Sequence, residues 1–292
     1  MRFALIGILV LTMAQFGLAA GIPRAVATTT MIYDLVKQIG GDKVEVRGLL
    51  AAGADPHTYK PVPGDAMAIA ESQIVFRNGL KLEGWMDKLV ENAGGQRPII
   101  TVSDGMPAVD DPAQAGHPDP HIWFSIPSWK LAVDNVVKAL SDLAPESKDL
   151  FLARAVSYKR ELDSLHNWAK IEMAKIPESR RYLVTSHDAF NYFGKEYGLT
   201  VIGVQGISTE TQASSQDVAG IVKFIKQHSI PAIFVETSVN PKLIEEISRQ
   251  SGVKVGGTLY GDSTGPVGSG ADTYIGMISS NVRTIVAALG GK

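Results

Sequence analysis

Three histidines and one aspartate are the side chains of this sequence best placed to bind a metal ion. His57 follows an Asp-Pro pair, and His121 repeats the same Asp-Pro-His pattern. Proline fixes its own φ and restricts the residue before it, so each pattern presents its imidazole from a stiff bend. His187 directly follows a predicted strand, and Asp262 follows another. Imidazole and carboxylate groups are ordinary ligands of zinc.

The other three histidines fit simpler roles. His117 lies in a polar loop rich in Pro, Gly and Asp, where it is at most a weak auxiliary ligand. His166 flanks a predicted helix stripe, and His228 ends a predicted helix, where its cation would complement the dipole. A lone loop histidine is usually only solvated or hydrogen-bonded. The long separations between the four candidates also lack the specificity of a His-x-x-x-His motif.

Composition excludes several kinds of site. The chain has 292 residues and no cysteine, which rules out thiolate zinc sites, iron–sulfur clusters, disulfides and lipid attachment through an N-terminal cysteine. Lys and Arg number 28 against 30 Asp and Glu, so no strong basic field favours a nucleic-acid partner. A bound metal must therefore be held by His, Asp or Glu.

Residues 1–20 have the pattern of a signal peptide. Arg2 precedes an apolar stretch that ends near Met13, and small residues lead to Ala20. The apolar stretch is shorter than the roughly 20 residues that a membrane-spanning helix needs, which disfavours the alternative of an N-terminal anchor. We expect an exported, soluble periplasmic protein that is not lipidated.

Short β-branched runs alternate with amphipathic stretches over the rest of the chain, which predicts an α/β fold. Each half is expected to form a similar lobe, a four-stranded parallel sheet with helices. Strands are predicted at 24–29, 44–50, 74–78, 99–102, 182–185, 200–204, 232–236 and 254–259. Helices are predicted to start near Met31 and Gly64 and to cover 82–93, 189–197, 216–228, 241–251 and 274–289.

One long helix is predicted between the two halves, over about 147–176. Apolar residues from Phe151 to Ile171 recur there at steps of three or four and form a single stripe. Such a helix would be about 45 Å long and would run along both lobes as a rigid connector, so we expect small lobe movements. The predicted division is an N-terminal lobe at 21–142, a linking helix at 143–178 and a C-terminal lobe at 179–292.

This fold would position the candidate ligands together. Ligands of open α/β sheets bind outside the carboxyl ends of the strands, and three of the four candidates follow such ends. Two candidates come from each half. The residues could therefore converge in a cleft between the lobes.

The sequence resembles the TroA-like proteins, the cluster A-I solute-binding proteins of bacterial zinc and manganese ABC importers, over essentially its whole mature length. The matching motifs are Ala27-Thr28-Thr29-Thr30-Met31, Gly53-Ala54-Asp55-Pro56-His57 with Tyr59, Asn78-Gly79-Leu80, Asp119-Pro120-His121-Ile122-Trp123, Thr185-Ser186-His187-Asp188-Ala189-Phe190 with Tyr192-Phe193, Phe234-Val235-Glu236-Thr237-Ser238 and Gly261-Asp262-Ser263. The resemblance implies metal ligands at His57, His121, His187 and Asp262. It also implies one transported Zn²⁺ or Mn²⁺ per chain, delivery to an ABC permease in the inner membrane, a monomer and no enzymatic activity.

The ligand set favours zinc over manganese. Three imidazoles and one carboxylate suit four-coordinate zinc, whereas manganese prefers more oxygen ligands. Manganese-selective relatives often carry Glu in place of His187, but zinc-dedicated relatives often have a long His-rich loop where this chain has only His117. A bidentate Asp262 would also add an oxygen for manganese, which therefore stays as the alternative.

Two other classes of function stay open from the residues. A zinc-dependent hydrolase would need an open metal position and a base, for which Glu210 or Glu236 could serve. Our hypothesis for Glu236 is instead that it orients a ligand histidine and fixes its tautomer. A metal-binding adhesin would need an exposed binding face that no motif reveals.

Overall fold

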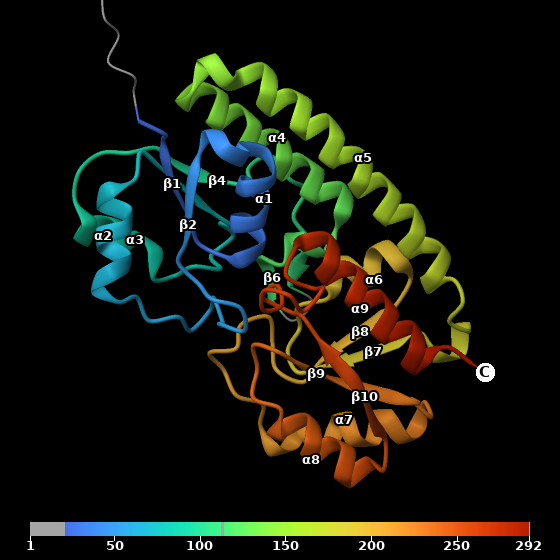
Figure 1. Cartoon of the computed structure of the whole chain (residues 1–292). Coiled ribbons are helices and arrows are strands. Elements are labelled where there is room, and N and C mark those ends of the chain that lie inside the picture. Colours follow the sequence, from blue (N-terminus) through green and yellow to red (C-terminus); the bar gives the residue numbers. More distant parts are fainter. Residues whose placement is uncertain (1–20, 112–113, 292) are drawn as a thin grey trace, which may run out of the picture.

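Two α/β lobes lie one beside the other along one long helix (Figure 1). The structure is a computed structural model that describes residues 21–111 and 114–291, so the predicted signal peptide lies outside the described residues. The strands are β1 (Arg24–Ala27), β2 (Glu45–Gly48), β3 (Ile74–Arg77), β4 (Ile99–Thr101), β5 (Asp110–Asp111), β6 (Gln114–Pro118), β7 (Tyr182–Thr185), β8 (Thr200–Gly203), β9 (Ala232–Glu236) and β10 (Lys254–Leu259). The α-helices are α1 (Thr30–Gly40), α2 (Pro63–Glu71), α3 (Met86–Ala93), α4 (Ile126–Leu143), α5 (Lys148–Met173), α6 (Asn191–Tyr197), α7 (Ser215–Gln227), α8 (Lys242–Ser251) and α9 (Tyr274–Leu289). Short 3-10 helices are η1 (Gly41–Lys43), η2 (Ile122–Phe124), η3 (Pro145–Ser147) and η4 (Glu178–Arg180).

The N-terminal lobe is built on a four-stranded parallel sheet, as predicted, and its strand order is β2-β1-β3-β4. Its central strands are apolar on both faces because helices cover both sides. In β1, Val26 joins the apolar cluster beneath α2 and α3, whereas Ala25 and Ala27 face the main core with α1. The carboxyl ends of these strands point toward the second lobe (Figure 1).

The C-terminal lobe has the same layered design. Its strands form two parallel pairs, β7 with β8 and β9 with β10, and β7 lies next to β9. Alternate residues again face opposite clusters: Val184 packs beneath α7 and α8, and Leu183 packs into the main core. The two-lobed α/β prediction is confirmed, although the hydrogen-bonded ladder joins the described strands as two pairs rather than as one four-stranded sheet.

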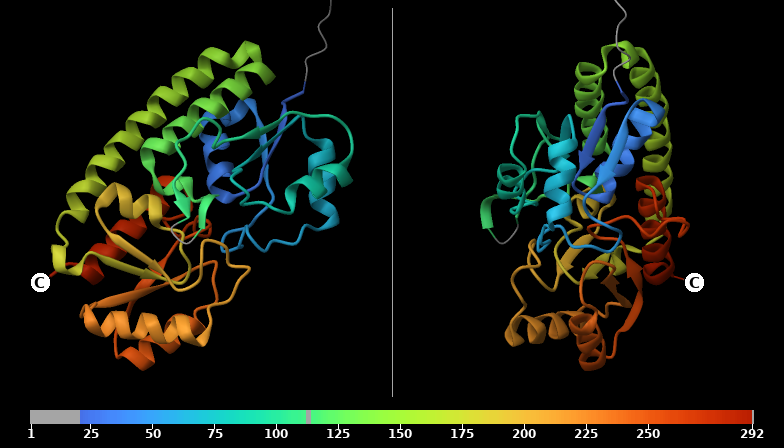
Figure 2. Two further views of the ribbon diagram at one scale, coloured as in Figure 1. Left: turned by 180° about the vertical axis from the view of Figure 1, so that it is seen from behind. Right: turned by 60° about the vertical axis from the view of Figure 1, so that its left-hand side comes forward.

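Helix α5 runs along both lobes, as its apolar stripe predicted (Figure 2). It has 26 residues and packs against α4, α1 and α9. The main apolar cluster is continuous from Ala27 in the first lobe, through Phe151 and Leu162 of α5, to Phe234 in the second. The lobes therefore share one core along α5. No helix in the described part of the chain is both long and apolar enough to cross a membrane.

Helix α4 and the β5–β6 hairpin were not predicted. Ser125 caps α4 by accepting a hydrogen bond from the backbone N–H of Ser128, and Pro127 lies in the first turn. Buried apolar residues from Ile126 to Leu140 then recur at helical spacing. These local signals are sufficient to predict the helix, which pairs with α5 along the shared core.

Candidate metal centre

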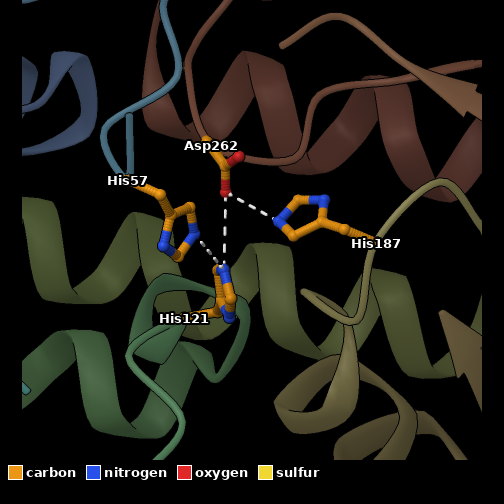
Figure 3. A group of neighbouring side chains, drawn as sticks. All are labelled: His57, His121, His187 and Asp262. Atoms are coloured by element: carbon orange, nitrogen blue, oxygen red, sulfur yellow. Dashed lines mark hydrogen bonds and ion pairs between the residues drawn. The ribbon is translucent and has the colours of Figure 1, made fainter. Parts of the chain in front are cut away.

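The structure brings all four candidate ligands together between the lobes (Figure 3). One ligand atom each from His57, His121, His187 and Asp262 lies within 4.8 Å of the others. The Nε2 atoms of His57 and His121 are 3.3 Å apart. Asp262 Oδ1 lies 3.5 Å from His121 Nε2 and 3.3 Å from His187 Nε2. All four side chains are buried.

Each ligand comes from a turn at the facing edges of the lobes. His57 lies in the loop after β2, beyond Gly53, whose φ of 79° suits a residue without a Cβ. His121 lies between β6 and η2, His187 two residues after β7, and Asp262 three residues after β10. Three ligands thus follow carboxyl ends of parallel strands, where open α/β sheets place their ligands.

Asp119 holds the His121 ring from behind. Its Oδ1 lies 2.7 Å from His121 Nδ1 and also accepts the His121 backbone N–H at 2.8 Å. Asn191 and Tyr192 secure Asp119 in turn, by bonds to its side chain and its carbonyl oxygen. Burial alone would lower the pKa of His121, but the Asp119 and Asp262 carboxylates outweigh it and raise the pKa to about 9. With Nδ1 directed at Asp119, Nε2 faces the other ligands.

Glu236 lies in a similar place behind the His187 ring, at ion-pair distance but outside hydrogen-bond geometry. Glu236 Oε2 lies 2.8 Å from His187 Nδ1, and Oε1 accepts the His187 backbone N–H at 2.9 Å. Both side chains are buried. Burial opposes protonation of His187, yet the carboxylates of Asp262 and Glu236 hold its pKa well above the usual range. Glu236 therefore lies behind the ring, as the sequence hypothesis of an orienting group requires.

His57 is held through its backbone instead. Asp55 Oδ1 accepts the backbone N–H of His57 at 2.8 Å and so shapes the turn. Burial lowers the pKa of His57 to about 4. The Asp262 carboxylate opposes this shift, but burial together with the neighbouring His121 and His187 rings outweighs it. His57 is therefore neutral at pH 7, which is the state that can ligate a metal.

Asp262 supplies the negative charge of the centre. Burial alone would raise its pKa, but His187 and His121 outweigh burial and hold the pKa well below the usual range. Its Oδ2 accepts a hydrogen bond from Ser238 at 3.1 Å. Asp262 Oδ1 and His187 Nε2 are both buried and lie 3.3 Å apart. Neither atom makes a hydrogen bond with any of the described residues. Such polar atoms aimed at a common point are those that a cation would satisfy.

The donor set fits a divalent transition metal. Three imidazole nitrogens and one carboxylate match the tetrahedral coordination of zinc, and a second Asp262 oxygen would suit manganese. The site residues thus have both the number and the type of ligand atoms that one ion needs.

Two pockets adjoin the centre, where the lobes meet. The first, the His57 pocket, has a volume of about 490 Å³ and is lined by His57, Leu80, Lys81, Leu82, Gly84, His117, Pro118, Pro120, Gly206, Ile207, Ser208, Glu210 and Thr211. The second, the side pocket, has about 480 Å³ and is lined by Asp55, Thr58, Gln205, Thr209, Glu210, Gln212, Ala213, Ser238, Val239, Asn240, Lys242, Leu243 and Glu246. Both pockets take walls from both lobes.

The remaining histidines lie elsewhere. His117 is exposed on the wall of the His57 pocket. His166 has its Nδ1 3.2 Å from the Tyr197 hydroxyl. His228 ends α7 and packs against the rings of Tyr182 and Phe224. None of these three belongs to the four-residue cluster.

Asp119 is the site residue that the sequence interpretation left without a role. The signal was present, because an aspartate two residues before a ligand histidine can reach both its backbone N–H and its ring. Only its burial beside Asn191 and Tyr192 distinguishes it from Asp55, which occupies the same place in the other Asp-Pro-His pattern but contacts no ring.

Comparison with known proteins identifies the family. The family described as "Zinc-uptake complex component A periplasmic" (ZnuA) matches residues 25–288. The chain belongs to this family. The manganese-binding lipoprotein MntA of Bacillus subtilis is 40% identical, over 91% of this chain and 89% of that protein. The zinc-binding protein TroA of Treponema pallidum is 37% identical, over 93% and 90%.

Solved structures agree with the family assignment. The periplasmic zinc-binding protein TroA of Treponema pallidum superimposes with a TM-score of 0.89 at 36% identity, covering 93% of this chain and all of that one. A manganese-bound single-site mutant of a periplasmic metal-binding protein of Candidatus Liberibacter asiaticus gives a TM-score of 0.84 at 25% identity, over 91% and 99%. The resemblance noted from the motifs is thus confirmed, and the family is one of solute-binding proteins rather than of enzymes.

The expectation about lipidation is corrected by these relatives. We expected a protein that is not lipidated, but MntA of Bacillus subtilis and PsaA of Streptococcus pneumoniae are both named lipoproteins. The expectation relied on the cysteine count alone. What the relatives support is export.

Proposed function

We propose that this protein is the solute-binding component of an ABC importer and carries one divalent transition-metal ion between its lobes. The ligands are His57, His121, His187 and Asp262. The observation that carries the proposal is the convergence of four buried ligand atoms within 4.8 Å, two from each lobe. The family membership supports the transport role and a membrane permease as the partner.

We propose zinc as the preferred cargo, with manganese as the alternative. Three of the four ligand atoms are imidazole nitrogens, which hold Zn²⁺ more tightly than Mn²⁺. The carboxylates behind His121 and His187 raise the basicity of both rings. The relatives named above include both zinc-binding and manganese-binding proteins. A single ion per chain, a monomer and lobes bounded at 21–142 and 179–292, with the linking helix at 143–178, complete the proposal.

The first experiment is elemental analysis of protein purified without chelator, followed by competition of Zn²⁺ against Mn²⁺. The expected result is one equivalent of metal and tighter binding of zinc. Protein that binds neither ion would contradict the proposal.

Variants at His187 test the assigned ligand. His187→Ala should weaken zinc binding steeply, because a buried ligand is lost beside Asp262. His187→Glu should shift the preference toward manganese, because it replaces a nitrogen ligand with oxygen. An unchanged zinc affinity in His187→Ala would exclude His187 from the ligand set.

A further inference from the structure

One carboxylate connects the His57 turn to the opposite lobe. Asp55 Oδ1 accepts the backbone N–H of His57, and Asp55 Oδ2 accepts the Thr58 hydroxyl at 2.8 Å. The same Oδ2 accepts the Thr209 hydroxyl at 2.6 Å. Thr58 belongs to the same turn, whereas Thr209 belongs to the β8–α7 loop, residues 204–214 of the C-terminal lobe. The Thr209 bond therefore joins the lobes at a ligand-bearing turn.

The β8–α7 loop bridges two ligand segments. Near its start, the backbone N–H of Gln205 donates to Ser186 O at 3.0 Å, and Gly206 O accepts from Asp188 N at 3.2 Å. Ser186 and Asp188 flank His187. Farther along, Thr209 reaches the turn that carries His57. The loop thus spans from one ligand turn to another across the interface.

This loop also forms the wall between the two pockets. Glu210 lines both, Thr209 faces the side pocket, and Ser208 and Thr211 face the His57 pocket. An ion that reaches or leaves the centre beside His57 passes this wall. A bond that holds the loop against the His57 turn would keep the pocket closed around that passage.

His57 is the least restrained of the three ligand imidazoles. A carboxylate lies behind the ring of His121 and another behind the ring of His187. His57 is positioned through its backbone by Asp55, and its side chain lines a pocket. It is 8% exposed, against 0% for His121 and His187. His57 is therefore the ligand whose departure needs the smallest rearrangement.

We propose that Thr209 is a positioning residue for metal exchange: its hydrogen bond to Asp55 holds the β8–α7 loop against the His57 turn and slows release of the ion through the His57 pocket. This inference rests on the proposed function. It adds to that function the step that sets the rate of metal release, which is the separation of the β8–α7 loop from the His57 turn, and it names Thr209 as the residue that controls this step. A second bond between the lobes, from Gly53 N–H to Ser263 Oγ at 2.8 Å, does not involve Thr209.

The test measures zinc release from the full, zinc-loaded protein. Zinc loss to a chromogenic chelator is followed at several chelator excesses, so that the rate independent of chelator can be extracted. Thr209→Val keeps the shape of the side chain but removes the hydroxyl, and we expect release about ten-fold faster, since the lost bond is to a charged group. Thr209→Ser restores the hydroxyl and should return the rate close to that of the wild type.

Thr58→Val is the matched comparison. This variant removes a hydroxyl that donates to the same Asp55 oxygen, but from within the N-terminal lobe. If the bond between the lobes controls release, Thr58→Val should accelerate release much less than Thr209→Val does. The thermal midpoint of the metal-free Thr209→Val protein should fall by only a few degrees, so that release is measured on folded protein.

Two results would overturn the inference: a Thr209→Val release rate within two-fold of the wild type, or equal acceleration by Thr58→Val. The zinc stoichiometry of the wild type is measured first. A wild type that takes up no zinc contradicts both the proposed cargo and this inference, whereas normal loading with unchanged release contradicts the inference alone.

Discussion

Two carboxylates behind the imidazoles decide how the centre presents its nitrogens. Asp119 and Glu236 each lie within hydrogen-bond distance of a ring Nδ1. A carboxylate in this place accepts a hydrogen bond from Nδ1–H, which keeps the proton on Nδ1 and directs the Nε2 lone pair at the metal. The two acids therefore support the candidate ligands without belonging to the four-residue cluster.

Removing the charge behind His187 should weaken binding. We expect Glu236→Gln to lose about 10- to 100-fold in zinc affinity, because a neutral amide supports the ring less well than a carboxylate does. Competition with a chelator of known affinity measures the loss. Glu178→Gln, a change at an exposed position of η4, is the control and should bind as the wild type does. Equal affinities for the two variants would remove the orienting role of Glu236.

Metal binding should release protons at neutral pH. The pKa of His121 is about 9 in the metal-free protein and that of His187 is also raised, so both rings are protonated at pH 7 and must lose a proton before Nε2 can ligate. Affinity should therefore rise as pH increases from about 6 toward 9 and fall as pH decreases. His57, with a pKa of about 4, is already neutral and releases none.

Calorimetric titration with zinc at pH 7, in buffers of different ionisation enthalpy, counts these protons. About one to two protons released per zinc bound are expected. A heat of binding that is independent of the buffer would show that the two rings are neutral before the metal arrives.

At the scale of single elements, the turn after β10 shows why a glycine precedes Asp262. A Cβ at Gly261 would overlap Glu236 Oε2 and lie 3.4 Å from His187 Cε1. The Gly261 carbonyl also accepts the Trp123 indole N–H at 2.9 Å, which fixes the turn against the other lobe. The absence of a side chain is what allows the acid, the imidazole and the turn to pack together.

Gly261→Ala should therefore weaken zinc binding, although Gly261 is the neighbour of a candidate ligand and not a ligand itself. The added methyl group displaces Glu236 from His187, and we expect zinc affinity to drop by about ten-fold or more. Crowding of this buried turn should also lower the free energy of unfolding by about 1–3 kcal/mol. Chelator competition and denaturant unfolding measure the two effects.

Gly220→Ala is the matched control for that change. Gly220 is exposed in α7, and a methyl group added there would meet no other atom within 4 Å. Alanine should therefore stabilise the helix by about 0.5–1 kcal/mol and leave zinc affinity unchanged. If Gly261→Ala bound zinc as tightly as Gly220→Ala does, the close packing at Gly261 would have no role in the site.

At the scale of the whole molecule, the lobes are tied together by hydrogen bonds that do not involve the side chains of the four candidate ligands. Asp34 of α1 accepts the backbone N–H of Tyr274, the first residue of α9, at 2.9 Å. The Tyr274 hydroxyl donates to Trp123 O at 2.8 Å, and Thr264 N–H donates to Thr30 Oγ1 at 2.7 Å. Together with the core shared along α5, these bonds oppose a wide separation of the lobes.

Small-angle scattering should therefore show little change on metal binding. A compact monomer of this length has a radius of gyration of about 19 Å, and the zinc-loaded and metal-free proteins should agree within measurement error. Any rearrangement should be local to the turn that carries His57, since no carboxylate lies behind its ring. An expansion of several ångströms after zinc removal would contradict the rigid connection along α5.

Most helices and strands, and the candidate ligands, could be predicted from local sequence patterns. The strand Tyr182–Thr185 and the helix Tyr274–Leu289 were predicted to the residue, because apolar spacing and caps such as Thr273 lie in adjacent sequence. Helix α4 carries similar signals but was not predicted. The four candidate ligands were recognisable in local motifs, three of them after predicted strand ends.

Tertiary structure decided how those residues meet. Asp119 and Asp55 occupy equivalent places in two Asp-Pro-His patterns, yet only Asp119 lies against its histidine ring. Glu210 and Glu236 were alternative bases in the sequence interpretation, which assigned the orienting role to Glu236 alone. The fold buries Glu236 behind His187 and leaves Glu210 exposed at the pockets. Helical hydrogen bonds, caps and apolar periodicity involve residues that are close in sequence, so helices and strands can be predicted from the chain. The relative placement of turns from two lobes depends on how their shared core packs, which no single segment encodes.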